Sequence, residues 1–156
     1  MLTKLIVIQP TSFCNLNCKY CYVPGRKDNQ LMSFDIVDAC ARVISNSKVT
    51  EPTNPDEKLI ISWHTGEPLT AGLPFYEYVM KSFSTHNHKN INFSMNIQTN
   101  GILINQSWCD FFNEYKFVVC TSVDGPELIH NHQRVGWNNS GSFAKVMRGA
   151  NLLKKN

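Results

Sequence analysis

The strongest constraint on the fold of this chain is a regular alternation of short apolar segments with longer amphipathic ones. Segments of strand length are predicted at 5–8, 59–63, 91–97 and 117–120, and each precedes a segment with apolar residues at helical spacing. Such alternation predicts an α/β fold with a parallel sheet and right-handed crossovers. With 156 residues, 42% of them hydrophobic, the chain is expected to form about one domain with its own core.

The helices have recognisable beginnings, and two segments are predicted to be loops. Ser33, Asn105 and Ser142 are predicted N-caps, and Pro74 suits the first turn of the second helix. The proline-containing segment 51–58 is predicted to be a linker, and 126–141 a polar loop. Four such units do not close a barrel, so we expect the sheet to keep an unpaired edge.

A polar cluster follows each predicted strand. The clusters are three cysteines after the first strand, then 64–68, 98–101 and 122–126 after the next three. Parallel α/β folds place their active sites at the carboxyl ends of the strands. The sequence therefore predicts that these four clusters share one site.

The three cysteines, Cys14, Cys18 and Cys21, have the spacing C-x3-C-x2-C. Three thiolates can hold three irons of a [4Fe–4S] cluster and leave the fourth iron open to a substrate or cofactor. The alternative is a structural zinc site, which needs a fourth protein ligand. The first histidine after the triplet is the distant His64, and no second cysteine pair follows at zinc-ribbon spacing. The spacing therefore favours the cluster.

Composition argues against several classes of protein. The net charge is only +3 and no block of Lys and Arg is present, so we expect no nucleic-acid partner. The apolar runs are too short to span a bilayer, and the amino terminus has no signal-peptide pattern. Six cysteines without an export signal indicate a reducing cytoplasm rather than a disulfide scaffold.

Together with the triplet, the stretches 9–14, 64–68, 98–101 and 122–126, followed by His130 and Arg134, resemble the radical S-adenosylmethionine (SAM) superfamily. Within it, the chain looks most similar to SPASM-type maturases, which include the anaerobic sulfatase-maturing and the cyclophane-forming peptide enzymes. The resemblance implies a partial (β/α)6 TIM-like barrel. Residues 1–156 would be a truncated core domain with about four βα units, without the last two units and the SPASM region.

The resemblance also implies a chemistry. Cys14, Cys18 and Cys21 would ligate a [4Fe–4S] cluster whose open iron binds SAM. One electron would cleave SAM to a 5′-deoxyadenosyl radical, which abstracts hydrogen from a peptide or protein substrate. A reductant such as flavodoxin or ferredoxin would supply the electron. The substrate itself is not readable from this half of the enzyme.

Six further residues acquire cofactor roles from the resemblance. Tyr20 would lie near the adenine of SAM, and Ser122 and Arg134 would contact its ribose and carboxylate. Arg suits a carboxylate because it can donate two parallel hydrogen bonds. The turn Thr65-Gly66-Glu67-Pro68 resembles the Gly-Gly-Glu-Pro motif that meets the SAM amine. Because Thr resists a positive φ, we expect ordinary backbone at residue 65.

The remaining polar residues and cysteines have less specific interpretations. Gln98 and Asp124 could line the pocket or cap turns. His130 and His132 are interpreted as structural or substrate-side residues rather than metal ligands. Three other cysteines, which are expected to behave as small hydrophobic residues on apolar faces, are Cys40, Cys109 and Cys120.

Three hypotheses follow for the whole chain. The first is the amino-terminal part of a radical SAM maturase. The second is a fragment that binds the cluster but is inactive, because part of the barrel is absent. The third is a zinc-stabilised interaction module that uses Cys14, Cys18 and Cys21 structurally.

Overall fold

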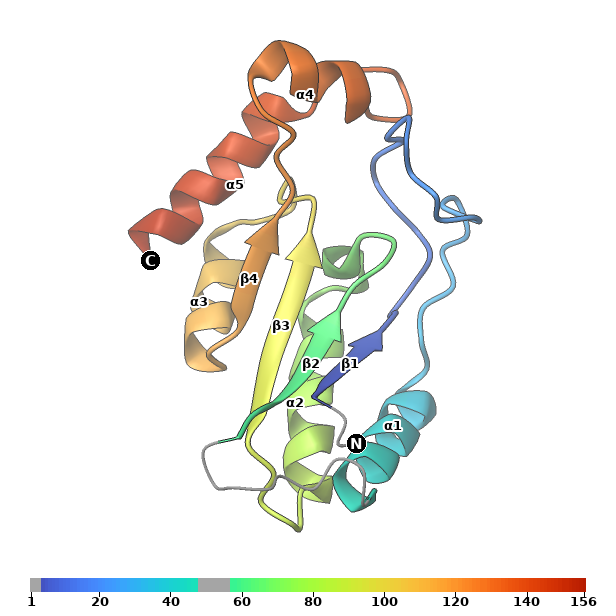
Figure 1. Cartoon of the computed structure of the whole chain (residues 1–156), viewed down its shortest axis with the longest axis vertical. Helices are drawn as coiled ribbons and strands as arrows, with labels where there is room; N and C mark the ends of the chain where they lie inside the picture. The colour runs from blue at the N-terminus through green and yellow to red at the C-terminus, as the bar shows by residue number, and fades with distance from the viewer. Residues whose placement is uncertain (1–3, 48–56) are drawn as a thin grey trace.

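A computed structural model describes residues 4–47 and 57–156 of the chain (Figure 1). The elements follow in the order β1 (Leu5–Ile8), α1 (Phe34–Asn46), β2 (Leu59–Trp63), the 3-10 helix η2 (Pro68–Ala71), α2 (Leu73–His86), β3 (Phe93–Thr99), α3 (Gln106–Glu114), β4 (Val118–Thr121), α4 (Glu127–Gln133) and α5 (Phe143–Lys155). The predicted linker at 51–58 lies almost entirely outside the described residues.

The four strands form one parallel sheet in the order β1-β2-β3-β4. Leu5 pairs with Ile60, Leu59 with Phe93, and Asn96 with Val118. The predicted parallel α/β architecture is therefore confirmed. All four strands end on the same side of the molecule, where α4 and the loop after β1 lie across them (Figure 1).

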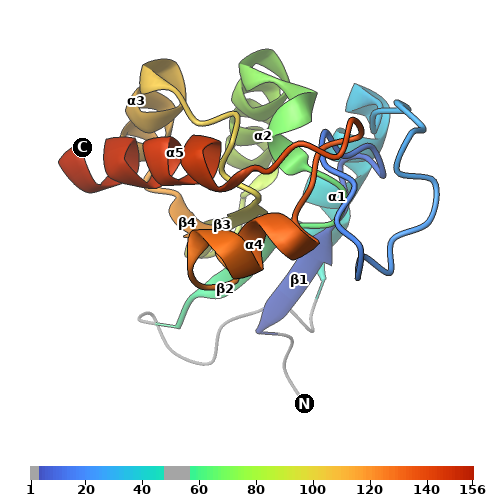
Figure 2. The ribbon, with the colours of Figure 1, turned by 90° about the horizontal axis from the view of Figure 1, so that it is seen from above.

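Helices α1, α2 and α3 cover one face of the sheet, as the view from above shows (Figure 2). On β2 the alternate residues Leu59, Ile61 and Trp63 are buried toward this layer. Trp63 makes edge-to-face contacts with Phe75 and Tyr76 of α2, with ring centroids 6.0 and 5.5 Å apart. Aromatic pairs of this geometry add to the stabilisation from burial, so the core fixes how the strands lie against the helices.

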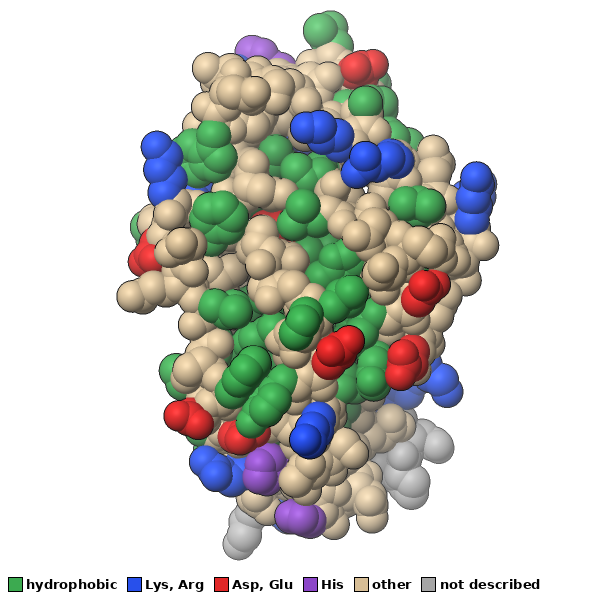
Figure 3. Space-filling view, turned by 180° about the vertical axis from the view of Figure 1, so that it is seen from behind, with side chains coloured by type: hydrophobic (Ala, Val, Ile, Leu, Met, Phe, Trp, Pro, Cys, Tyr) green, Lys and Arg blue, Asp and Glu red, His purple; other side chains and the backbone are tan. Residues whose placement is uncertain are grey.

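The outer surface of this helical layer is mixed in character. From behind, hydrophobic side chains lie in small patches between charged and polar ones (Figure 3). This is typical of a solvated helical face. Among the described residues, no helix is long and apolar enough to cross a membrane.

The opposite face of the sheet has no helical layer over it in the described part of the chain (Figure 2). Residues 94, 96 and 98 of β3 are half-buried there, and Leu5 and Val7 of β1 are exposed. Cys120 of β4 is exposed too, so the expectation that it lies on an apolar face is wrong. Its strand is an edge strand of the described sheet. Cys120 lies on the uncovered side, whereas its neighbour Val119 is half-buried against the core. Cys109 is buried in α3 as expected, and Cys40 is half-buried against the core.

The predicted N-cap residues lie at the starts of their helices, but they do not all cap them by a side-chain hydrogen bond. The Asn105 side chain accepts a hydrogen bond from the Trp108 N–H at 3.0 Å and caps α3. Ser33 and Ser142 occupy N-cap positions, yet within the described chain neither side chain makes a capping hydrogen bond. The Ser142 hydroxyl donates instead to the carbonyl oxygen of Arg134 at 2.7 Å. This contact belongs to the site described next.

Candidate functional site

One pocket lies where the carboxyl ends of the strands meet the loop that follows β1. We call it the strand-end pocket, and its volume is about 160 Å³. All nine residues that the sequence analysis assigned to metal or cofactor line it, namely Cys14, Cys18, Tyr20, Cys21, Thr65, Gly66, Glu67, Ser122 and Arg134. The topology thus brings together residues that are more than 100 positions apart in the chain.

The segment 9–33, here called the cysteine loop, has no regular secondary structure and is held by backbone hydrogen bonds. The Cys14 N–H donates to the carbonyl of Arg26 at 3.0 Å within the loop. The Asn17 and Lys19 N–H groups donate to the carbonyls of Val135 and Gln133 at 2.7 and 2.9 Å. These last two bonds attach the loop to the last residue of α4 and to the segment that follows it, so the positions of the cysteines depend on distant sequence.

The three thiols are free and face the pocket. Burial raises the pKa of the Cys14 thiol to about 11, and burial also raises that of Cys18. The Leu16 N–H donates to the Cys14 sulfur at 3.4 Å, and the Asn100 side-chain amide approaches it at 3.9 Å. Donors of this kind favour a thiolate. A metal that displaces the proton would therefore find Cys14 already provided with hydrogen-bond donors.

The three thiols are a donor set of the kind that metal sites use. Within residues 4–47 and 57–156, no three His, Cys, Asp or Glu side chains form a group that could hold one metal ion. A zinc ion needs all its sulfur ligands about 2.3 Å from one point, whereas a four-iron cluster takes each thiolate at a separate iron. The donor set of three thiols is chemically suited to an iron–sulfur cluster.

The turn after β2 has backbone geometry that the sequence analysis did not foresee. Thr65 has a φ of 80°, so the expectation of ordinary backbone there is wrong. Gly66 follows with a φ of 63°, and a Cβ at this position would lie 2.5 Å from the Thr11 carbonyl oxygen and 2.7 Å from that of Phe13. The cysteine loop packs directly on the Gly66 backbone, which leaves no room for a side chain at this position.

Glu67 is 1% exposed and its carboxylate ties two strand ends together. One oxygen accepts from the Leu69 N–H at 3.0 Å and from the Thr99 hydroxyl at 2.6 Å, and the other accepts from the Asn100 N–H at 2.7 Å. Burial raises the pKa of this carboxyl, while the three donors oppose the rise. Glu67 therefore has an observed structural role, and its contact with a cofactor stays a prediction.

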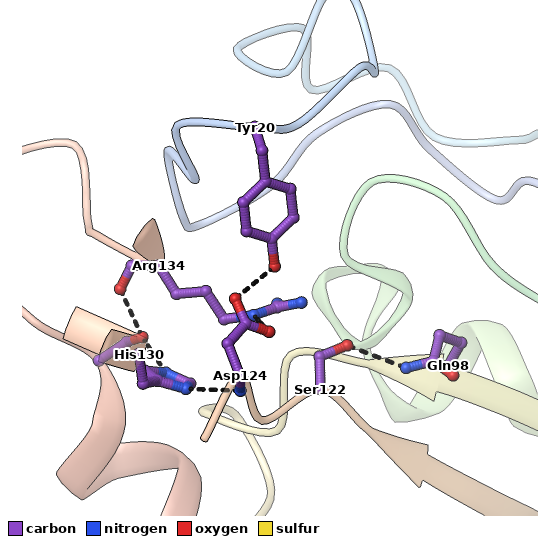
Figure 4. A network of polar contacts seen from close by, with 7 residues as sticks. Tyr20, Gln98, Ser122, Asp124, His130 and Arg134 are labelled. Atoms are coloured by element: carbon purple, nitrogen blue, oxygen red, sulfur yellow. Dashed lines mark hydrogen bonds and ion pairs between the residues drawn. The ribbon is translucent and has the colours of Figure 1, made fainter. Parts of the chain in front are cut away.

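Arg134 and Asp124 form an ion pair at the side of the pocket (Figure 4). The Arg134 Nε lies 2.8 Å from one Asp124 oxygen, and the Tyr20 hydroxyl donates to the other oxygen at 2.6 Å. Burial alone would raise the pKa of Asp124, but Tyr20 and Arg134 lower it below its usual value. Burial and the bond to Asp124 raise the pKa of Tyr20 to about 12. The pair orients Arg134 through Nε, so the two terminal guanidinium nitrogens can contact an anionic ligand.

His130 contacts the backbone of Asp124 directly and that of Arg134 through the Ser142 hydroxyl (Figure 4). The residue is 0% exposed and belongs to α4, a helix in the segment predicted to be a loop. Its Nε2 lies 3.0 Å from the Ser142 hydroxyl, and its Nδ1 accepts from the Asp124 N–H at 3.4 Å. Because Ser142 gives its proton to the Arg134 carbonyl, the Nε2 of His130 is the donor in the first contact. His130 is thus structural, as one interpretation held, whereas His132 is exposed.

Ser122 and Gln98 complete the wall of the pocket (Figure 4). The Gln98 side-chain amide donates to the Ser122 hydroxyl at 3.0 Å. The hydroxyl proton of Ser122 is consequently available to a ligand oxygen. Gln98 lines the pocket, as one of its two interpretations allowed, and it orients Ser122.

Two residues that contact the cysteine loop were missed by the sequence analysis. Asn100 is buried, and its amide bridges the Cys14 sulfur and the Asn15 side chain, the latter at 2.7 Å. Trp137 donates its indole N–H to the Cys14 carbonyl at 2.9 Å. The turn motif at 98–101 could have drawn attention to Asn100, but no local pattern marks Trp137.

Comparison with known proteins supports the relationship that the motifs indicate. The sequence model of the Radical SAM superfamily matches residues 8–156. An uncharacterized protein of Synechocystis sp. is 41% identical over 99% of this chain and 38% of its own length. The cysteine-type anaerobic sulfatase-maturating enzyme of Clostridium perfringens is 35% identical over 97% of this chain and 41% of its own. The serine-type enzyme of Bacteroides thetaiotaomicron is 34% identical, over 96% and 36%.

The fold has neighbours of the same kind. The solved structure of native anSMEcpe with bound AdoMet and Kp18Cys peptide superposes with a TM-score of 0.85 at 36% identity, covering 97% of this chain and 40% of that one. The sheet and helices therefore match a partial radical SAM TIM-like fold, as predicted. The chain spans between 36% and 41% of the length of these relatives.

Proposed function

Because this chain belongs to the radical SAM superfamily, we propose that it forms the part of a peptide- or protein-modifying radical SAM enzyme that binds a [4Fe–4S] cluster and SAM. One observation carries the proposal. The three thiols and six predicted cofactor residues line a single pocket at the strand ends. On this proposal, residues 1–156 are the truncated core domain of a longer enzyme.

Cys14, Cys18 and Cys21 would hold the cluster as thiolates, leaving one iron for SAM. When bound, the cluster supplies the single electron that cleaves the sulfonium of SAM, which is chemistry that the protein does not perform itself. The contribution of the chain is to fix the loop and to stabilise charge. The N–H groups beside the Cys14 sulfur stabilise its thiolate form.

The remaining residues would bind and orient SAM. The guanidinium of Arg134, fixed by Asp124, suits the carboxylate of SAM, and the free hydroxyl proton of Ser122 suits a ribose oxygen. Backbone carbonyls of the turn at Thr65 and Gly66 would accept from its amine, near the negative charge of Glu67. Tyr20 would lie beside the adenine, because the residue is 53% exposed and its ring can contact a planar base.

The proposed substrate is a peptide or protein segment. Two features support this choice. The similar sulfatase-maturating enzymes and the peptide-bound neighbour point to peptide chemistry. Half-buried polar side chains at 94, 96 and 98 lie along the uncovered face of β3, and the last of them lines the pocket, so they can hydrogen-bond to peptide groups. Six free cysteines suit a reducing cytoplasm as the place of action.

Anaerobic iron–sulfur reconstitution followed by electron paramagnetic resonance (EPR) tests the proposal. We expect a [4Fe–4S] signal that shifts when SAM is added and that is lost in Cys14→Ala. Cys120→Ala is the matched control, because this exposed cysteine lies outside the pocket and its variant should retain the signal. Zinc in place of iron would refute the proposal. A cluster that does not respond to SAM would favour the inactive-fragment hypothesis.

A further inference from the structure

Trp137, an exposed aromatic residue in the segment after α4, contacts the backbone of the cysteine loop. The residue is 39% exposed, and its indole N–H donates to the Cys14 carbonyl at 2.9 Å. Trp137 is not among the residues that line the strand-end pocket. It therefore contacts the backbone of a proposed cluster ligand without lining the pocket proposed for SAM.

Two cations flank the indole ring. The Arg26 guanidinium lies 5.6 Å and the Lys27 ammonium 4.8 Å from the ring centroid, both within cation–π range. Arg26 also donates to the Cys18 carbonyl at 3.2 Å. Arg26, Lys27 and Trp137, here called the Trp137 patch, thus reach two of the three proposed cluster ligands through single hydrogen bonds.

The surroundings of the patch are positively charged. Lys19 and Lys27 are exposed, and Asp28 is the one acidic residue between positions 12 and 30. Beside Trp137 lies a polar hollow of about 260 Å³ with Lys145 in its lining. Neither Arg26 nor Lys27 is among the residues that line the strand-end pocket.

We propose that the Trp137 patch is the docking surface for an acidic protein that carries one electron. This inference rests on the proposed function, because it requires a cluster at Cys14, Cys18 and Cys21. With SAM in the strand-end pocket, a protein donor must approach the cluster from another side, and the patch is a surface directly outside two of its ligands. In the transfer, one electron leaves the carrier and enters the cluster, and no bond forms or breaks.

The recognition is expected to be weak and electrostatic. Electron-transfer complexes have small interfaces, and complementary charge raises their association rate more than their affinity. An exposed Trp between two cations suits such an interface, because Trp and Arg are enriched where proteins bind one another. The rate of encounter should accordingly fall as salt is added.

The test uses this chain with a reconstituted cluster and reduced flavodoxin as the acidic carrier. Stopped-flow absorbance gives the second-order rate of cluster reduction, and titration calorimetry gives binding without turnover. We expect Lys27→Glu to lower the rate at low salt by about tenfold, to weaken binding, and to flatten the salt dependence. Lys27→Ala should show a smaller loss of about threefold, because it changes the charge by one unit and not two.

Two controls separate docking from damage to the protein. Lys81→Glu makes the same charge change on an exposed position of α2 and should leave the rate unchanged. Photoreduced 5-deazaflavin, a small reductant that needs no docking surface, should reduce every variant equally. Equal rates for Lys27→Glu and Lys81→Glu with flavodoxin, or no binding of flavodoxin by the unmodified protein, would overturn the docking proposal while the SAM-dependent EPR shift stays. Failure to form any cluster would overturn the proposed function, and the docking proposal with it.

Discussion

Replacing Gly66 by Ala should destabilise the chain for two separable reasons. The first is conformational, since a left-handed φ of 63° costs an Ala residue about 1–2 kcal/mol relative to Gly. The second is steric. The new Cβ would lie 2.5 and 2.7 Å from two carbonyl oxygens of the cysteine loop, and these are backbone atoms that cannot rotate away. Overpacking of this kind costs about 1–3 kcal/mol, so we expect a total loss of about 2–5 kcal/mol.

Gly25 provides a matched control for the conformational part. Its φ is 65°, nearly that of Gly66, but a Cβ there would meet no atom closer than 3.8 Å. Gly25→Ala should therefore lose only about 1–2 kcal/mol. The difference between the two variants isolates the contact between the cysteine loop and the turn.

Urea unfolding of the metal-free, reduced chain measures both losses. With a slope near 2 kcal/mol/M, Gly66→Ala should lower the urea midpoint by about 1–2.5 M and leave the slope unchanged. Equal midpoints for the Gly66 and Gly25 variants would refute the steric argument. They would show that the loop moves away from the turn at no cost.

Three further predictions concern Thr65, Arg134 and His130. Thr65→Gly should raise the free energy of unfolding by about 1 kcal/mol, because it relieves a β-branched residue at positive φ, and Asn90→Gly should gain less since Asn tolerates this region. Arg134→Lys should weaken SAM binding to the cluster-loaded chain by about tenfold in calorimetry, because Lys lacks the planar fork. Burial and the charge of Arg134 lower the pKa of His130 in the folded state. The stability that the neutral histidine contributes is present above the unfolded-state pKa of about 6.5 and should be lost as the pH falls through the lower folded-state pKa. His130→Gln should remove this pH dependence.

Each of these predictions has an outcome that contradicts it. A loss of stability in Thr65→Gly would mean that the turn depends on the Thr side chain and not on its backbone. Unchanged SAM affinity in Arg134→Lys would show that the guanidinium does not grip the carboxylate. A pH profile of urea midpoints that is the same with and without His130 would assign the acid sensitivity to another group.

Much of the architecture was predictable because the spacing of apolar residues along a strand or a helix is a local property of the sequence. The alternation of Leu59, Ile61 and Trp63 fixes which face of β2 is buried before any partner is known. The convergence of four polar clusters was also predictable, because parallel strands end on one edge. Neither inference needs knowledge of distant contacts.

The errors arose where distant contacts override local pattern. Helix α4 is short and polar, and it is stabilised where His130 packs beneath Asp124 and against Ser142. Thr65 adopts a positive φ in a turn on which the cysteine loop packs at the next residue. Cys120 has apolar neighbours in sequence, but the helices cover only the other side of its strand. Trp137 meets Cys14 across more than 100 residues, a pairing that no local motif encodes.

The attachment of the cysteine loop to the end of α4 and to the segment after it has a consequence for protein synthesis. A ribosome produces the three cysteines early, but the carbonyls of Gln133 and Val135 and the indole of Trp137, which hold their loop, emerge only about 120 residues later. At about 5–20 residues per second, the nascent thiols wait roughly 6–24 seconds without their final geometry. Cluster insertion should therefore follow translation of this region, so a cell that makes this protein must keep the nascent cysteines reduced until the chain has passed Trp137.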